Sequence, residues 1–277
     1  MRQAFALMTL VTVIAIVAAG CGGSEEPPAA TTEAAPLPVD LRIIFPEGLN
    51  VREMADRVGA VRKIAIAKRG VTPKLTRTAY LAALAKTTPP KPFLKDWKGT
   101  SMEGFLFPAS YDFTQYTTGK ELVSHQLTAF RKRFARVDLT HAKSKNLTPY
   151  DVLKIASMIE KETVEPKERK LVAAVIYNRL RNRMPLGIDA TLRYGLNIPG
   201  TKSLTKEALR SDSPYNSRRF PGLPPTPVAN PGLASIKAAA HPAAVDYLYY
   251  VRIPGTKRHF FTASESEFLQ YEATHGY

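Results

Sequence analysis

The residue best suited to acid–base chemistry in this sequence is a glutamate on the apolar face of an expected helix. The segment 151–163 (DVLKIASMIEKET) places Val152 and Ile159 on one stripe at the helical period, and Glu162 falls on the same stripe. A carboxyl group among apolar neighbours stays protonated more easily, because loss of water disfavours its charged form. Such a group can donate a proton to a leaving oxygen and later accept one. Glu162 is therefore the candidate general acid, whereas Glu160 is expected to face solvent.

The sequence leaves two other environments open for Glu162. Its side chain lies near the end of the expected helix and could turn into solvent, or it could pair with a buried arginine. Arg179 falls on the apolar face of a second expected helix, 167–184, and could hold either Glu168 or Glu162. An ion pair with Glu162 would lower the pKa of that carboxyl and weaken the case for a proton donor.

Local signals place this glutamate in a chain of helices and short strands. Thr148 is a good N-cap, Pro149 suits the first helical position, and Asp151 follows at the third. Upstream, a strand-like run at 41–45 precedes a helix that begins at Asn50, with a glutamate three residues on as in a capping box. Further expected elements are helices at 74–86 and 120–137 and a C-terminal β portion at 247–251. The pattern predicts an α+β fold whose larger part is mostly helical.

Composition excludes several other kinds of site. The 277 residues carry 39 Lys and Arg against 24 Asp and Glu, a net charge of +15. The single Cys excludes a disulfide framework and a cysteine-built metal site, and the five His show no metal-ligand spacing. The glycine motifs of phosphate-binding loops and nucleophile elbows are absent as well. We therefore expect chemistry that needs no metal and no cofactor.

The N-terminus has the layout of a secretory signal. Arg2 precedes an apolar run at 4–19, and small residues then lead to the only cysteine, Cys21. This order resembles a bacterial lipoprotein signal over residues 1–21, in which Cys21 becomes lipidated; a plain signal anchor is the alternative. Residues 22–38 are too polar and proline-rich to fold and are expected to form a tether. The rest of the chain would then lie at the extracytoplasmic face of the cell membrane.

An exported position changes the meaning of the positive charge. Basic patches usually indicate nucleic acid, but an exported protein rarely meets it, so nucleic acid is not an expected partner. Anionic lipid headgroups or anionic wall polymers are better counterparts for the cations. A basic surface that is merely solvated is the alternative.

Four sequence blocks carry a resemblance to a known family. The most specific is the run 155–195, which contains Glu-Lys-Glu-Thr and, in the next expected helix, Asn-Arg-Leu. The other blocks are EGFLFP from Glu103, the segment 213–242, and YLYYV from Tyr247 with HFFTASESEF from His259. In this order they resemble the YceG-like (MltG) family of endolytic lytic transglycosylases of bacterial peptidoglycan.

The resemblance implies a domain organisation and a catalytic residue. The family's catalytic acid is the second Glu of Glu-Lys-Glu-Thr, which is Glu162 in this sequence. The resemblance also implies a LysM-like module at 39–98 and a YceG-like catalytic domain at 99–277. Two departures stand out: members commonly have an additional module where this chain has only the tether, and the family's usual Asp-Pro is Asp189-Ala190 here.

The implied reaction cuts the β-1,4 bond between N-acetylmuramic acid and N-acetylglucosamine in nascent glycan strands. Glu162 would protonate the leaving oxygen and then accept the proton of the muramic 6-hydroxyl as that hydroxyl attacks C1, which leaves a 1,6-anhydro end. Such cleavage would serve cell-wall assembly and glycan-strand termination. Two alternatives are a hydrolytic glycosidase that uses Asp189 as a second carboxylate, and a non-enzymatic wall-binding lipoprotein. Expected partners are glycan strands, the membrane and peptidoglycan synthases.

Polar residues in the matched blocks are candidates for substrate binding or for support of the acid. Those at 189–194 could hydrogen-bond the sugar or orient the glutamate, and two asparagine amides could bind N-acetyl groups. Each also has a structural alternative, as a turn former or as a core residue. Phe105 and Phe107 could stack on sugar rings or pack in the core. The supporting candidates are Glu103, Asn178, Asp189, Thr191, Tyr194 and Asn216.

Overall fold

The structure, a computed structural model, describes residues 37–99 and 101–276. The described residues from Pro38 onward belong to one compact unit. The expected lipoprotein signal with Cys21, and nearly all of the expected tether, lie outside the described residues. Within the described residues, no helix combines the length and the apolar character that a membrane crossing requires.

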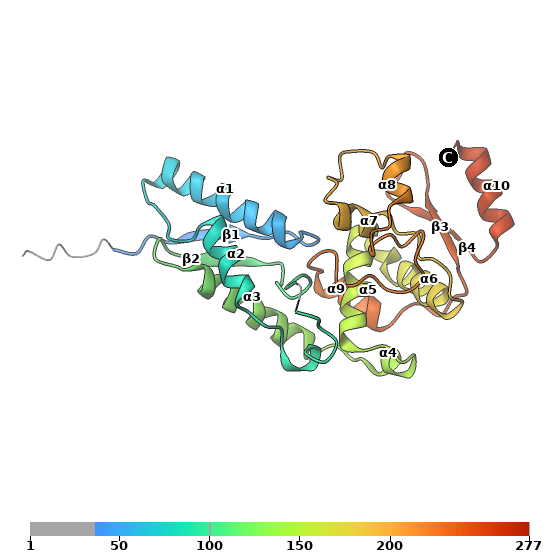
Figure 1. Cartoon of the computed structure of the whole chain (residues 1–277), viewed down its shortest axis with the longest axis horizontal. Helices are drawn as coiled ribbons and strands as arrows, with labels where there is room; N and C mark the ends of the chain where they lie inside the picture. The colour runs from blue at the N-terminus through green and yellow to red at the C-terminus, as the bar shows by residue number, and fades with distance from the viewer. Residues whose placement is uncertain (1–36, 100, 277) are drawn as a thin grey trace, which may run out of the picture. The chain divides into compact units, whose positions relative to one another are not determined.

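The first strand of the chain pairs with a strand about 70 residues later, and three helices accompany the pair (Figure 1). Strand β1 (Leu41–Ile44) runs antiparallel to β2 (Ser110–Phe113), with Leu41 opposite Phe113. The remaining elements up to residue 134 are α1 (Val51–Arg69), α2 (Arg77–Ala85), the 3-10 turn η1 (Lys91–Phe93) and α3 (Gly119–Phe134). Helix α2 packs against both α1 and α3.

The second half of the chain is built around α5 (Pro149–Glu162), which packs against α6 (Arg169–Arg181), α7 (Asp189–Leu196) and α9 (Leu233–Ala240). An antiparallel hairpin of β3 (Tyr249–Arg252) and β4 (His259–Thr262) follows, and α10 packs on it. The other elements of this half are α4 (Thr140–Ser144), the 3-10 turn η2 (Pro166–Glu168), α8 (Lys206–Arg210) and α10 (Glu265–His275).

Helix starts lie where the capping residues predicted them. The Asn50 side chain accepts the backbone N–H of Glu53, whose carboxylate accepts the N–H of Asn50, which completes a capping box. Thr148 and Asp151 form the same reciprocal pair at the start of α5, with Pro149 in the first helical position. The caps satisfy backbone N–H groups that the helices themselves cannot, and they fix where α1 and α5 begin.

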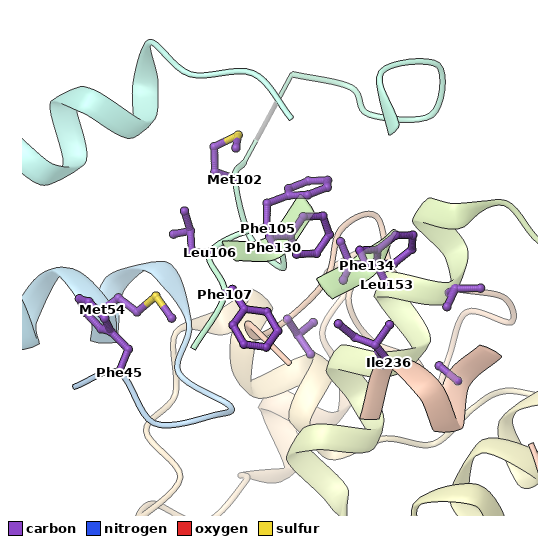
Figure 2. Close-up of a cluster of buried hydrophobic side chains, with 14 of the residues drawn as sticks. Phe45, Met54, Met102, Phe105, Leu106, Phe107, Phe130, Phe134, Leu153 and Ile236 are labelled. Carbon is purple, nitrogen blue, oxygen red and sulfur yellow. The ribbon is translucent and has the colours of Figure 1, made fainter. Parts of the chain in front are cut away.

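An aromatic cluster joins the two halves of the chain. Phe105 is fully buried, with its ring edge-on to Phe93 and Phe130 and stacked on Tyr150 of α5 at 5.8 Å between ring centroids. Figure 2 shows Phe105 beside Phe130, with Phe107 and Leu106 on the same segment. Phe107 is also buried, under the guanidinium of Arg133. Both phenylalanines of the EGFLFP block are core residues, which rules out the sugar-stacking alternative for them.

Two glycines allow segments to approach more closely than a side chain would permit. A Cβ on Gly119, the first residue of α3, would lie 2.5 Å from the carbonyl oxygen of Ala79 in α2. Gly104 has φ +88°, and a Cβ there would lie 2.7 Å from Pro227. These contacts bring α3 onto α2 and the EGFLFP segment onto the loop before α9.

The predicted α+β class is confirmed, with helices predominating over two small sheets among the described residues. The LysM-like identity of 39–98 stays a prediction, as does the domain boundary between residues 98 and 99. The β1–β2 ladder crosses that boundary, because β2 belongs to the part expected to be catalytic.

Candidate functional site

Glu162 is the last residue of α5 and is half-buried. The apolar stripe that the sequence predicted for this helix, with Val152 and Ile159, is fully buried, and so is Ile155 between them. Thr163 follows with extended backbone angles and ends the helix. The end of a buried helix therefore presents the Glu162 carboxyl at the edge of the core.

The carboxyl of Glu162 has a defined hydrogen-bond donor. The hydroxyl of Tyr250, on β3, donates to Glu162 Oε2 at 3.1 Å. Burial and the neighbouring Glu162 raise the pKa of Tyr250 well above its usual value. The phenol therefore keeps its proton and can donate it to Glu162 when that carboxyl is ionised.

Opposing influences set the protonation of Glu162, and the net effect is a raised pKa. Loss of water is the largest cause, and the negative charge of Asp189 adds to it. The Tyr250 hydrogen bond and the positive charges of His259 and Arg252 act in the opposite direction. Because burial dominates, the protonated form persists to higher pH than for a free glutamate.

The residue after Glu162 carries an unusual polar atom. Among the described residues, Thr163 Oγ1 is the one buried side-chain oxygen or nitrogen without a hydrogen-bond partner. The residue is 7% exposed. A buried hydroxyl without a hydrogen-bond partner destabilises the folded state. This one belongs to the residue that directly follows the candidate acid.

Asp189, the first residue of α7, is a second carboxylate close enough to Glu162 to influence its pKa. Its Oδ1 accepts a hydrogen bond from Nε of Arg218 at 2.6 Å, and both side chains are about half exposed. The structure thus places Asp189 at the candidate site and gives it a guanidinium partner.

Thr191 and Asn216 are buried and bonded to the protein itself. Thr191 Oγ1 donates to the carbonyl of Ile188 at 2.7 Å and shares a hydrogen bond with Ser217 Oγ. Asn216 donates both amide protons to the carbonyls of Leu209 and Ser211. These contacts favour a positioning role, in which Thr191 holds the loop between α8 and α9 against α7 and Asn216 holds the same loop against the end of α8.

Asn178 and Arg179 hold the segment that leads into β3. Asn178 donates to the carbonyls of Val245 and Tyr247, both at 2.9 Å. Its amide protons are therefore used, which favours a structural role over binding of N-acetyl groups. Arg179 Nε donates to the carbonyl of Leu248 at 2.6 Å.

The guanidinium of Arg179 bonds backbone carbonyls and no carboxylate among the described residues. Its remaining hydrogen bonds go to the carbonyls of Pro185 and Leu186, and its guanidinium lies over the ring of Tyr249. Across residues 37–99 and 101–276, Arg179 forms no ion pair with Glu162 or Glu168. The sequence left open whether Arg179 pairs with a carboxylate, and in the structure backbone carbonyls satisfy this half-buried cation instead.

Glu168 pairs instead with a histidine from the C-terminal hairpin. Its carboxylate lies 2.7 Å from Nδ1 of His259 and also accepts the backbone N–H of His259 at 3.0 Å. Both side chains are less than a tenth exposed. This pair joins the start of α6 to the start of β4.

Glu103 and Tyr194 belong to a different buried network. The carboxylate of Glu103 accepts the N–H of Val51, at the start of α1, and Nδ2 of Asn230. Burial raises the pKa of Glu103 to about 8, against the opposing effect of donors that include the Tyr194 hydroxyl. The backbone carbonyl of Tyr194 also accepts a hydrogen bond from Arg52. These contacts favour a structural role for both residues, as a link between α1 and the later part of the chain.

The expectation that Glu160 faces solvent was wrong. This residue is half-buried, and its carboxylate accepts the backbone N–H of Gly232, just before α9, at 3.0 Å. Helical periodicity correctly separated Glu160 from the stripe of Glu162, but α9 packs on that flank as well.

A separate cleft of about 880 Å³ lies along α4, α6 and the segment 242–246. Tyr177 and Asn178 are on its wall, whereas Glu162 is not among its lining residues. The candidate acid therefore lies outside this cleft.

The sequence did not predict that two side chains, those of Tyr250 and His259, influence Glu162. Both lie in blocks that carried the family resemblance, but no local pattern assigned them a role. The alternation of side chains along a strand predicts only which residues share a face, and it does not predict a contact with Glu162.

Comparisons with known proteins identify relatives of this chain. A model of the YceG-like family matches residues 25–274. The chain is 33% identical over 214 residues to a Bacillus subtilis protein named endolytic murein transglycosylase, covering 76% of this chain and 58% of the relative. A Streptococcus pneumoniae protein of the same name is 31% identical over 242 residues, covering 83% of this chain and 42% of the relative. The chain thus spans about half the length of these curated relatives.

A solved structure has the same fold. The crystal structure of a yceG-like protein from Listeria monocytogenes matches with a TM-score of 0.70 and 28% sequence identity. The match covers 83% of this chain and 75% of the Listeria chain.

Proposed function

Because this chain belongs to the YceG-like family, we propose that it is an endolytic murein transglycosylase. Its substrate would be the β-1,4 bond between N-acetylmuramic acid and N-acetylglucosamine within a glycan strand, and its product a 1,6-anhydro end. The observation that carries this proposal is the half-buried carboxyl of Glu162, whose pKa is raised and which has a fixed donor in Tyr250.

In the first half of the reaction, protonated Glu162 gives its proton to the glycosidic oxygen. The bond from that oxygen to C1 of the muramic residue breaks, and positive charge develops on the sugar. The leaving N-acetylglucosamine thereby gains a free 4-hydroxyl. A raised pKa lets Glu162 keep this proton to higher pH than a free glutamate would.

In the second half, ionised Glu162 accepts a proton from the muramic 6-hydroxyl as its oxygen bonds to C1. The nucleophile belongs to the same sugar, so the step has the advantage of an intramolecular reaction and needs no water. Tyr250 stabilises the ionised carboxylate by its hydrogen bond. The proton is returned to Glu162, and one carboxyl serves both halves.

Asp189 has a supporting role in this scheme. Asp189 forms an ion pair with Arg218. The negative charge of Asp189 favours the protonated form of Glu162. A hydrolytic glycosidase would instead need a second carboxylate to activate water or to attack the sugar.

We also propose that the protein acts at the extracytoplasmic face of the cell membrane, anchored through lipidated Cys21, beside the synthases that make its substrate. The signal-like order of residues 1–21 supports this location. Labelling cells with a clickable fatty acid should mark the full chain, and Cys21→Ala should remove the label. Label that persists in Cys21→Ala would reject lipidation at this residue.

The direct test is the chemistry of the new chain ends. Purified protein is incubated with peptidoglycan, and the products are examined by mass spectrometry. We expect fragments that end in 1,6-anhydro-N-acetylmuramic acid. Reducing ends without anhydro products would favour the hydrolase, and no cleavage at all would favour a wall-binding protein.

The role of Glu162 is tested by Glu162→Gln, which keeps the size of the side chain and removes the titratable proton. Loss of a general acid costs about 10²–10⁴-fold in rate, so cleavage should fall by at least about 100-fold. Glu160→Gln is the matched control, because it changes the same residue type on the same helix and keeps an acceptor for Gly232. Equal activity in Glu162→Gln and wild type would remove Glu162 from the mechanism.

A further inference from the structure

One face of the C-terminal hairpin is turned toward Glu162. In the antiparallel register, Tyr250 lies opposite Phe261 and Arg252 lies opposite His259. Because side chains alternate along a strand and paired residues point the same way, these four share one face. The other face carries Tyr249 and Phe260, which stack on Phe268 and Tyr271 of α10.

The buried Glu168–His259 pair lies on the site-facing side of this hairpin. The carboxylate of Glu168 holds both the ring Nδ1 and the backbone N–H of His259. An ionised carboxylate can only accept, so Nδ1 carries a proton and the ring orientation is fixed. Two bonds from one side chain thus fix both the backbone and the ring at the first residue of β4.

The imidazole of His259 in turn contacts the ring of Tyr250. The two rings meet edge to face, with 5.4 Å between centroids and 88° between their planes. The hydroxyl of this same Tyr250 donates to Glu162. A continuous set of contacts therefore runs from Glu168 through His259 and Tyr250 to Glu162.

The pair also borders a cleft of about 440 Å³ formed by residues from the start of α6 and from β4. The charged and titratable groups around His259, besides its partner Glu168, are Glu162, Glu165, Lys167, Tyr250, Arg252 and Arg258.

We propose that the Glu168–His259 pair is a positioning unit for Glu162, which packs the His259 ring against Tyr250 and so holds the Tyr250 hydroxyl in place. The proposal rests on the proposed role of Glu162 as a proton donor. In this unit His259 acts on the reaction through Tyr250 and through its charge, without contact to the substrate.

The charge of His259 changes the pKa of Glu162 in a defined direction. A positive charge on His259 lowers the pKa of Glu162. Removal of that charge should therefore raise the pKa of Glu162 and keep the acid protonated to higher pH. The alkaline limb of the pH profile should move upward.

The variant His259→Asn tests the unit as a whole, because its amide can replace Nδ1–H as a donor to Glu168 but carries neither the charge nor the ring of the imidazole. We expect the alkaline limb of kcat/KM to move up by about 0.5–1 pH unit, with kcat reduced more than KM is changed. His241→Asn is the matched control, since His241 pairs with Asp138 at 3.2 Å on the exposed surface. An unmoved limb in His259→Asn would overturn the proposal.

A second measurement does not depend on cleavage. The carboxyl of Glu162 is titrated by carbon-13 NMR in the full chain, wild type and His259→Asn, after thermal unfolding has confirmed that both fold. We expect a higher pKa for Glu162 in the variant, and identical titration curves would reject the pair as a positioning unit. If wild type cleaves no peptidoglycan but the titration shifts, the proposed function fails while the coupling of His259 to Glu162 stands.

Discussion

Single residues around Glu162 show how a folded chain balances the charge of one carboxyl. Burial and Asp189 favour the protonated form, whereas Tyr250 and His259 favour the ionised form. A group that must both give and accept a proton needs both kinds of neighbour. The site therefore combines an apolar helix end with a few fixed polar contacts from the hairpin.

The Tyr250→Phe variant tests this balance at the bonded atom. Removal of the hydroxyl takes away a hydrogen bond that lowers the pKa of Glu162, so that pKa should rise further. The alkaline limb of kcat/KM should move to higher pH, and kcat should fall about 3- to 10-fold, since a hydrogen bond contributes about 0.5–1.5 kcal/mol. Tyr249→Phe is the control, because that ring faces α10. A pH profile measured on peptidoglycan decides, and a downward shift contradicts the prediction.

Thr163 offers a test of the unpartnered hydroxyl beside the acid. Thr163→Val keeps the shape of the side chain and removes the buried oxygen, so the free energy of unfolding should rise by about 1 kcal/mol. Thr191→Val removes a hydroxyl that is fully bonded and should lower it by a similar amount. Chemical unfolding measures both changes. A less stable Thr163→Val would mean that this hydroxyl has a partner in solution.

Residue identities at the site could be predicted from the sequence only in part. Glu162 was found because helical periodicity is a local property and α5 is regular. The partner of Arg179 could not be found, because a buried guanidinium can be satisfied equally by carboxylates or by carbonyls. The carbonyls that bind it belong to residues 185, 186 and 248, and only the folded chain brings these together.

At the level of elements, the sequence predicted the helix starts but not the pairing of distant strands. The starts of α1 and α5 followed from their caps, which involve residues three apart. The pairing of β1 with β2 spans most of the expected N-terminal module and left no local trace in the sequence. Glu160 was misplaced for a related reason, since helical periodicity does not reveal that α9 covers a second flank of α5.

The crossing of α2 and α3 depends on one glycine. Gly119→Ala would place a Cβ 2.5 Å from the backbone oxygen of Ala79, so the two helices must separate. We expect the free energy of unfolding to fall by about 1–3 kcal/mol, as for other overpacked cores. Gly59→Ala on α1 is the matched control, because its Cβ would meet only Arg77 Cβ at 3.8 Å. That change should be neutral or stabilising by up to about 1 kcal/mol. Equal unfolding midpoints for both variants would contradict the close crossing.

At the level of the whole molecule, Glu103 links the first helix to the loop before α9. Its carboxylate and Asn230 meet there, and Asn230 also bonds the EGFLFP segment through the N–H of Leu106. One buried acid thus connects three stretches of chain that are far apart in the sequence. The family resemblance marked Glu103 as a candidate for substrate binding or for support of the acid, because a matched motif does not distinguish these roles from a structural one.

This buried acid should make global stability depend on pH. The pKa of Glu103 is raised from 4.5 to about 8, so the folded state binds a proton that the unfolded state has lost between these values. The free energy of unfolding should therefore decrease as pH rises from about 4.5 to about 8. Glu103→Gln should remove that part of the slope, while the contribution of Glu162 stays in both proteins. Denaturant unfolding at several pH values measures this, and parallel curves would mean that Glu103 is ionised when folded.

The two-sided hairpin has a practical consequence. Tyr250 and His259 occupy one side, and the aromatic stacks with α10 occupy the other. A fluorescent or fluorine-labelled reporter placed on α10 would sense displacement of β3 or β4 while leaving the carboxyl untouched. Any displacement of the hairpin on binding of the proposed glycan substrate could then be followed from α10, independently of turnover.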